Sequence, residues 1–161
     1  MTNAIKSKVA VLVLAIAGST TLLMNLEGAP PNGKPYVDIA GVWTDCYGNT
    51  KGVRREFIRT PSECKALLGG EAARIGKFIQ ADLPDVNQNE LTSLISFTYN
   101  VGDSAYRGST LRSMFKEGQN RAGCLQMHRW NKITKGKRKV VAKGLVNRRT
   151  AEVAVCLQEV Q

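Results

Sequence analysis

The feature that most constrains this chain is an uncharged run of 18 residues, Val9 to Leu26, which ends at the carboxylate of Glu27. A helix needs about 17–25 residues to cross a bilayer, so the run is near the lower limit for spanning. Lys6 and Lys8 precede it, and positive charge before an apolar segment keeps the N-terminus in the cytoplasm and directs the remainder outward. The sequence therefore predicts a membrane-inserting segment over residues 1–26, with an acidic group at its outer end.

The composition of this run is weak for a permanent anchor. Small and hydroxyl-bearing side chains gain little free energy in lipid, and the run contains Ala10, Ala15, Ala17, Gly18, Ser19, Thr20 and Thr21. We therefore expect a segment that inserts during export, stays uncleaved and later leaves the membrane. Two alternatives remain. One is a signal peptide cleaved after Ala15-Ile16-Ala17; the other is a buried core helix, which is disfavoured because nothing polar interrupts any face.

The remaining residues, 27–161, are enough for one domain with a single hydrophobic core. A Pro- and Gly-rich stretch over 29–34 is followed by a predicted short strand and hairpin over 36–50. Thr60-Pro61-Ser62-Glu63 is a helix start signal. Further helices are predicted over 87–99, which is apolar on several faces, and over 109–117, 121–130 and 145–158, with a basic loop over 133–142. This pattern indicates an α+β fold with a small N-terminal β-lobe, a helical lobe and a cleft between them.

The net charge of +10 is concentrated in one part of the chain. Between Gly118 and Ala151 there is no Asp or Glu, whereas ten basic residues occur: Arg121, Arg129, Lys132, Lys135, Lys137, Arg138, Lys139, Lys143, Arg148 and Arg149. Such a block favours an anionic partner, which could be nucleic acid, an acidic membrane face or a cell-wall polymer. A solvated positive face that only maintains solubility is the alternative.

The cysteine pattern disfavours a metal site. Cys46, Cys64, Cys124 and Cys156 form no CxxC pair, and His128 is the only histidine, whereas zinc sites need Cys and His at short spacing. No metal and no cofactor are expected. Four scattered cysteines fit either reduced thiols or two disulfides, for which three pairings are possible.

Three polar residues near the membrane segment could carry glycosidic bond cleavage. This reaction needs a carboxylic acid to protonate the leaving oxygen and a second group to activate water or stabilise the transition state. Glu27 follows Leu22, Leu23 and Leu26, and an apolar setting would help its carboxyl keep a proton. Asp38 could hold a water, and Thr44 could orient it. Taken alone, the same three residues also suit a helix end, a turn and a strand surface, and Asp45 is a rival that should point away from Thr44.

The segment LEG…PYVDIAGVWTDCYGNT resembles the active-site hairpin of phage lysozymes, the endolysins of glycoside hydrolase family 24. It is most similar to the branch with an uncleaved signal-arrest-release segment. The resemblance continues through TPSECKALL, SFTYNVG, GSTLRSMF, CLQMHRW and GLVNRRTAEVAVC, which together span nearly the whole chain.

This resemblance implies a lysozyme-like fold and hydrolysis of the β-1,4 bond between N-acetylmuramic acid and N-acetylglucosamine in peptidoglycan. It assigns the catalytic roles to Glu27, Asp38 and Thr44. It also implies substrate contacts at Tyr99, Asn100 and Thr110, although core packing of Tyr99 and helix capping by Thr110 are equal alternatives. The implied disulfides are Cys46–Cys64 and Cys124–Cys156. Trp130 is interpreted as a core residue.

One departure concerns Glu27. Ten residues, GAPPNGKPYV, separate it from Asp38, two more than in the family pattern. The spacing from Asp38 to Thr44 matches that pattern. The insertion could form a bulge at Pro30-Pro31, or it could displace Glu27 from the cleft.

The combined hypothesis is a monomeric endolysin that is silent while residues 9–26 span the host inner membrane and active once it is soluble in the periplasm. No cysteine precedes Cys46, so control is expected to be positional and not redox. Rival hypotheses are a cationic membrane-disrupting protein and a lytic transglycosylase. A nucleic-acid binder is disfavoured because no recognition helix or aromatic-interleaved strand occurs.

Overall fold

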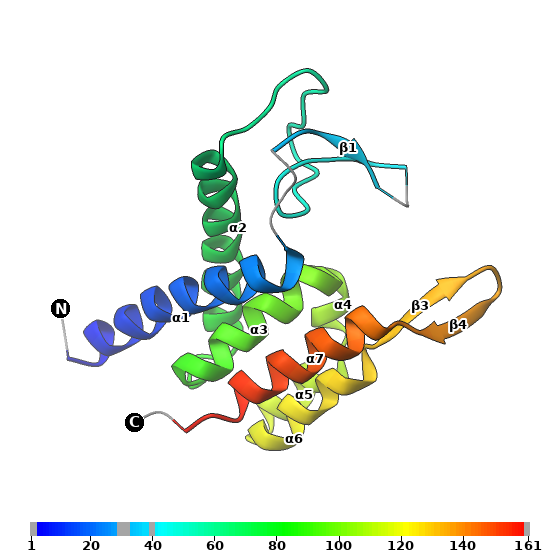
Figure 1. Ribbon diagram of the computed structural model, residues 1–161. Coiled ribbons are helices and arrows are strands. Elements are labelled where there is room, and N and C mark those ends of the chain that lie inside the picture. Colours follow the sequence, from blue (N-terminus) through cyan, green and yellow to red (C-terminus); the bar gives the residue numbers. More distant parts are fainter. Residues whose placement is uncertain (1–2, 29–32, 39–40, 160–161) are drawn as a thin grey trace.

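The computed structural model describes residues 3–28, 33–38 and 41–159. The elements run in the order α1 (Asn3–Glu27), β1 (Tyr36–Val37), β2 (Trp43–Thr44), α2 (Pro61–Asp82), α3 (Gln88–Val101), α4 (Asp103–Arg107), α5 (Thr110–Lys116), α6 (Asn120–Gln126), the 3-10 turn η1 (Met127–Arg129), β3 (Lys132–Lys135), β4 (Arg138–Val141) and α7 (Lys143–Cys156). A small lobe around β1 and β2 stands above the C-terminal end of α1, and the other helices form a second lobe around α3 (Figure 1). This is the expected lysozyme-like α+β arrangement.

The membrane-length helix is also part of the core. Among the described residues, α1 is the one helix long and apolar enough to cross a membrane. Its C-terminal half packs on α2 and α3 and buries Ala15, Ser19, Thr20 and Leu23. A buried core helix, disfavoured above, therefore describes this half of α1 in the folded state.

Small residues allow this close packing. A β-carbon on Gly18 would lie 3.2 Å from the side chain of Thr92 on α3, and one on Gly76 of α2 would lie 3.1 Å from Leu12. The hydroxyls of Ser19 and Thr20 donate to the carbonyl of Ile16 at 3.0 and 2.7 Å. Because their hydrogen bonds are made within α1, these hydroxyls can be buried at low cost.

The two long helices that follow begin at capping boxes. Thr60 caps α2 and Asn87 caps α3, and the carboxylates of Glu63 and Glu90 complete the reciprocal hydrogen bonds. The Gly69-Gly70 pair does not interrupt α2. Residues 91–98 of α3 are all buried, which confirms α3 as the central helix.

Two disulfides join the elements, in the pairing implied by the resemblance. Cys124–Cys156 links α6 to α7 in the helical lobe. Cys46–Cys64 links the small lobe to α2 and packs with Leu23 of α1, Tyr47 and Leu68 in a second, smaller core. Trp130 packs edge-to-face on Phe97, with 5.4 Å between ring centroids, as expected for a core residue.

The prediction of a basic loop over 133–142 was wrong. This segment forms the antiparallel hairpin of β3 and β4, which pair from Lys132 with Val141 to Lys135 with Arg138. Gly136, with φ of 62°, is at the first position of a two-residue turn, which suits a type II′ hairpin. The many charges masked two pairs of β-branched residues, Ile133-Thr134 and Val140-Val141, which favour strands.

Candidate active site

Glu27 is the last residue of α1 and contacts the far end of the chain. Gly28 follows with φ of 77°, a left-handed conformation that commonly ends a helix. A carboxylate oxygen of Glu27 accepts a hydrogen bond from a guanidinium nitrogen of Arg148 on α7. The Glu27 side chain is 26% exposed and that of Arg148 is 7% exposed. The carboxylate therefore meets a buried cation, and not the apolar surroundings expected from Leu22, Leu23 and Leu26.

Arg148 belongs to a buried polar cluster. Glu152 and Arg149 are fully buried, with 2.7 Å between a carboxylate oxygen and a guanidinium nitrogen. Glu152 also lies 3.7 Å from Arg148 and accepts a hydrogen bond of 2.8 Å from the hydroxyl of Ser96. Burial lowers the pKa of Arg149 to about 10, so the guanidinium stays charged at neutral pH. Burial also raises the pKa of Glu152, against the opposing effect of Arg149.

The sequence did not reveal this cluster. Arg148 and Arg149 were counted among the ten basic residues that favour an anionic partner, but both are buried and paired inside the protein. Glu152 lies four residues after Arg148 and three after Arg149, the spacing at which opposite charges meet on one face of a helix. This spacing was the available sequence signal for the cluster.

Asp38 and Thr44 lie on the β1–β2 hairpin. Asp38 follows β1, and one of its carboxylate oxygens accepts a hydrogen bond of 2.9 Å from the amide of Val42. Thr44 is buried, pairs with Tyr36 in the ladder and donates its hydroxyl proton to the carbonyl of Val42 at 3.1 Å. Since that proton is used, Thr44 can offer only its lone pairs to a water molecule. Residues 29–32, which contain the expected bulge at Pro30-Pro31, and residues 39–40 lie outside the described residues.

Asp45, the rival carboxylate, is structural. It is 1% exposed and bonds to the Nε of Arg59 at 2.8 Å and to the side-chain amide of Asn49 at 2.7 Å. These partners hold the turn over 45–49 and leave no accessible carboxylate for chemistry.

Tyr99 and Asn100 end α3 at the junction of the two lobes. The Tyr99 hydroxyl donates to the carbonyl of Tyr47 at 2.6 Å, and Asn100 accepts a hydrogen bond from Arg149. Burial, and then the negative charge of Glu27, raise the pKa of Tyr99 above its ordinary value. Thr110 is exposed at the start of α5, and Ser109 caps that helix in its place.

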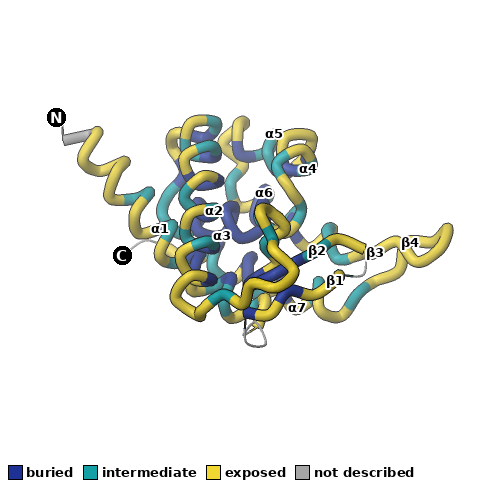
Figure 2. Tube along the Cα trace, turned by 90° about the horizontal axis from the view of Figure 1, so that it is seen from above, coloured by how far each residue is buried: buried dark blue, intermediate teal, exposed yellow. Residues whose placement is uncertain are grey.

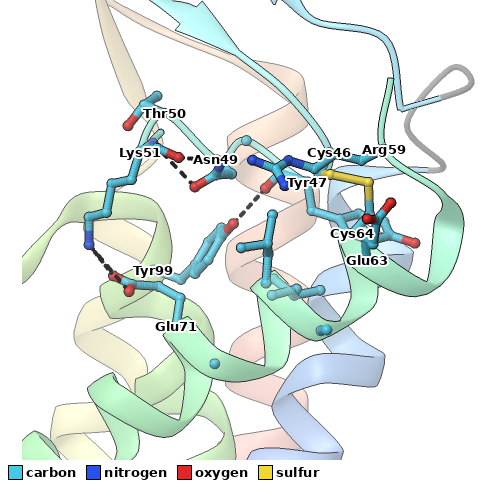
Figure 3. A pocket seen from close by; sticks show the side chains of 15 residues that line it. Cys46, Tyr47, Asn49, Thr50, Lys51, Arg59, Glu63, Cys64, Glu71 and Tyr99 are labelled. Carbon is cyan, nitrogen blue, oxygen red and sulfur yellow. Dashed lines mark hydrogen bonds and ion pairs between the residues drawn. A yellow bond between two sulfur atoms is a disulfide. The ribbon is translucent and has the colours of Figure 1, made fainter. Parts of the chain in front are cut away.

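A cavity of about 670 Å³ lies between α2 and the turn over 46–51. Figure 3 shows Tyr99 pointing toward Tyr47 across this space and Lys51 reaching toward Glu71 of α2. The Lys51 ammonium lies 3.3 Å from the Glu71 carboxylate oxygens. A hydrogen bond from Arg74, supported by Lys51, lowers the pKa of Glu71. The described lining residues include Tyr99 but not Glu27, Asp38 or Thr44, so of the candidate site residues Tyr99 is the one that borders this cavity.

Comparison with known proteins identifies the family. Residues 25–152 match the family model described as phage lysozyme. The SAR-endolysin of Pseudomonas phage phiKMV is 40% identical over 150 residues, which cover 92% of this chain and 89% of that protein.

Two solved structures of one endolysin share the fold. The active form of the P1 phage endolysin Lyz aligns with a TM-score of 0.74 at 23% identity, with 92% of each chain covered. Its secreted inactive form gives a TM-score of 0.52 at 21% identity, covering 84% of this chain and 93% of that one. The fold described here is thus closer to that of the active form. With a family match over most of its length and a relative at 40% identity, this chain belongs to the phage lysozyme family.

Proposed function

We propose that this protein is a signal-arrest-release endolysin, a muramidase that hydrolyses the β-1,4 bonds between N-acetylmuramic acid and N-acetylglucosamine in peptidoglycan during host cell lysis. The family match supports the activity. The observation that supports the site assignment is the hydrogen bond that Glu27, at the C-terminal end of α1, accepts from Arg148 of α7.

The proposed reaction uses one carboxyl group to donate a proton to the leaving oxygen and a second to activate the attacking water. Glu27 protonates the oxygen of the leaving sugar while the glycosidic bond breaks. Asp38 accepts one proton of the attacking water, and a lone pair of Thr44 accepts a hydrogen bond from the other. Tyr99 and Asn100 orient the glycan at the end of α3, and Thr110 contacts it from the start of α5.

The test of activity is turbidity clearing of outer-membrane-permeabilised Gram-negative cells by purified protein. The wild type is expected to clear them, and Glu27→Gln to lose clearing by at least two orders of magnitude, because the amide cannot donate the proton. Equal clearing by both would assign the activity to membrane disruption by the basic surface or to another acid. Anhydro-sugar products together with an active Asp38→Asn variant would identify a lytic transglycosylase.

We further propose that α1 controls this activity by position. In the tethered state, residues 1–26 occupy the inner membrane and residues 27–161 form a periplasmic domain. Glu27 is then at the bilayer surface. Arg148 lacks its partner Glu27, and the second core lacks Leu23. After release, α1 docks on α2 and α3 and a soluble, monomeric enzyme forms. The support is that one helix has both membrane length and buried core residues.

The exposed face of α1 allows this control to be tested separately from folding. Ala17 and Thr21 are exposed in the docked helix, so Ala17→Leu/Thr21→Leu strengthens membrane insertion without entering the core. This variant should stay in the membrane fraction after depolarisation and delay lysis, yet clear permeabilised cells normally once purified. Unchanged lysis timing would refute positional control, and the muramidase assignment would stand on the Glu27→Gln result.

A further inference from the structure

The β3–β4 hairpin projects from the helical lobe without a partner. Figures 1 and 2 show it extending beyond the start of α7, and every residue of its ladder is exposed. Two-stranded hairpins are marginally stable alone and usually bury one face. The proposed muramidase chemistry uses none of its residues.

The hairpin carries a dense positive charge. Residues 132–143 contain six basic residues and no acidic one: Lys132, Lys135, Lys137, Arg138, Lys139 and Lys143. Across the described ranges 3–28, 33–38 and 41–159, no ion pair involves any of these six, whereas Arg148 and Arg149 pair internally. The cations of the hairpin therefore remain available to an external anion.

Aliphatic side chains lie next to these cations. The register pairs Ile133 with Val140 on one face, beside the pair of Lys135 and Arg138, and Val141 lies on the other face beside Lys132. Ile133, Val140 and Val141 are all exposed. Each face of the hairpin therefore presents cations beside exposed aliphatic groups, a combination that suits contact with lipid phosphates and the adjoining acyl region.

We propose that the β3–β4 hairpin binds the anionic phospholipid headgroups of the membrane surface, as a second contact beside α1. The inference rests on the proposed tethering. With α1 in the bilayer, residues 28–35 are the connection to β1, and eight residues span at most about 28 Å. The domain is thus held against a phosphate-bearing surface.

Other anionic partners fit less well. Peptidoglycan offers isolated carboxylates rather than a continuous layer of charge, and it gives no site for the aliphatic pair. Nucleic-acid strands are bound by aromatic stacking platforms, and residues 132–143 contain no aromatic residue.

This contact has a consequence for release. The hairpin leads directly into α7, which carries Arg148. A hairpin on the membrane keeps α7 beside the point where α1 leaves the bilayer, so Glu27 has a short distance to reach Arg148.

Vesicle binding by the full-length protein tests the proposal without requiring enzyme activity. Cosedimentation is measured at low salt on phosphatidylglycerol/phosphatidylethanolamine vesicles and on phosphatidylcholine vesicles. Lys137→Gln/Lys139→Gln should weaken binding to the anionic vesicles roughly 30-fold, and salt should reduce the difference. Lys65→Gln/Lys77→Gln on α2 is the matched control, because it removes the same charge from two exposed residues and retains α1.

A loss confined to the hairpin variant supports the proposal. Equal losses in both variants, no loss in either, or equal binding of the wild type to both kinds of vesicle overturns it. A loss seen on purified sacculi but not on vesicles also overturns it and assigns the hairpin to peptidoglycan. Failure of Glu27→Gln to abolish clearing affects only the muramidase proposal.

Discussion

At the scale of single residues, Glu152 is the group that allows two arginines to be buried beside the candidate acid. Arg149 and Glu152 are fully buried, and Arg148 holds Glu27 from the same cluster. Charges removed from water are tolerated only when they are paired and hydrogen-bonded. Positioning of Glu27 therefore depends on a carboxylate one turn further along α7.

Replacing Glu152 by Gln should destabilise the protein by about 3–5 kcal/mol, because two buried cations lose their shared carboxylate. Urea unfolding at pH 7 measures this change in the free energy of unfolding. Glu159→Gln, an equal change of charge at an exposed position near the C-terminus, should stay within about 0.5 kcal/mol of the wild type. Similar values for the two variants would show that the cluster is not needed for folding.

Asp82 provides a pH-dependent contribution to stability. Its carboxylate accepts hydrogen bonds of 2.6 and 2.7 Å from Arg112 and lies 3.0 Å from Lys116. The hydrogen bonds from Arg112 lower its pKa below the ordinary 3.8. A folded-state pKa below the unfolded value stabilises the protein above pH 3.8, and this stabilisation is lost as the pH falls through the folded-state pKa.

Asp82→Asn should therefore lower the free energy of unfolding by about 1–2 kcal/mol at pH 7. The difference in this free energy between the variant and the wild type should shrink below pH 3.8. Thermal melts at a series of pH values measure it. The control is Asp85→Asn, since that carboxylate is 95% exposed and contacts Lys8 only at 4.0 Å. A difference that persists unchanged at low pH would contradict the ion-pair explanation.

At the scale of elements, one face of α1 packs against the domain and another face is exposed to solvent. Gly18 approaches Thr92, and the neighbouring Ala17 is exposed. A side chain at position 18 would press on the side chain of Thr92 in α3, whereas one at position 17 extends into solvent. The two positions separate docking of the helix from its affinity for lipid.

Gly18→Leu should lower the stability of the released protein by about 1–3 kcal/mol through overpacking, and its clearing activity should fall with it. Ala17→Leu should leave the free energy of unfolding within about 0.5 kcal/mol of the wild type and the clearing activity within about twofold of it. Urea unfolding and turbidity clearing of the purified variants measure the two effects. Equal stability of the two variants would indicate that α1 is not docked on α3 in solution.

At the scale of the whole molecule, each of the two cores contains a disulfide, Cys124–Cys156 in the main core and Cys46–Cys64 in the second, smaller core. Cys46–Cys64 joins the small lobe to α2 across 18 residues, and Cys124–Cys156 joins α6 to α7 across 32. A crosslink over loops of this length stabilises a protein by about 2–4 kcal/mol, mainly by restricting the unfolded chain.

Reduction should therefore lower the urea midpoint of the wild type, and Cys124→Ala/Cys156→Ala should reproduce part of that loss. The Cys46→Ala/Cys64→Ala variant should also lose activity, since this bond packs against Leu23 at the docked end of α1. Insensitivity of the midpoint to reductant would contradict a structural role for the bonds.

Local signals in the sequence predicted much of this fold. The Thr60-Pro61-Ser62-Glu63 signal predicted the start of α2 because capping is decided within four residues, and the apolar pattern of 87–99 identified the central helix. The burial of Arg148 and Arg149 could not be read in this way, because it depends on Glu152, Ser96 and Asn100 meeting in three dimensions. The β3–β4 hairpin was missed because its charges resembled those of a solvated loop.

The glycine and hydroxyl residues of α1 have a consequence for how such a protein can evolve. Gly18, Ser19 and Thr20 are small or hydroxyl-bearing residues that gain little free energy in lipid, and they also let the helix pack closely against α3. Under the proposed positional control, substitutions at these positions that delay lysis would also weaken the enzyme that carries out lysis. Selection on the timing of lysis would then act at outward positions such as Ala17 and Thr21, which are exposed in the folded enzyme and can change without altering its core.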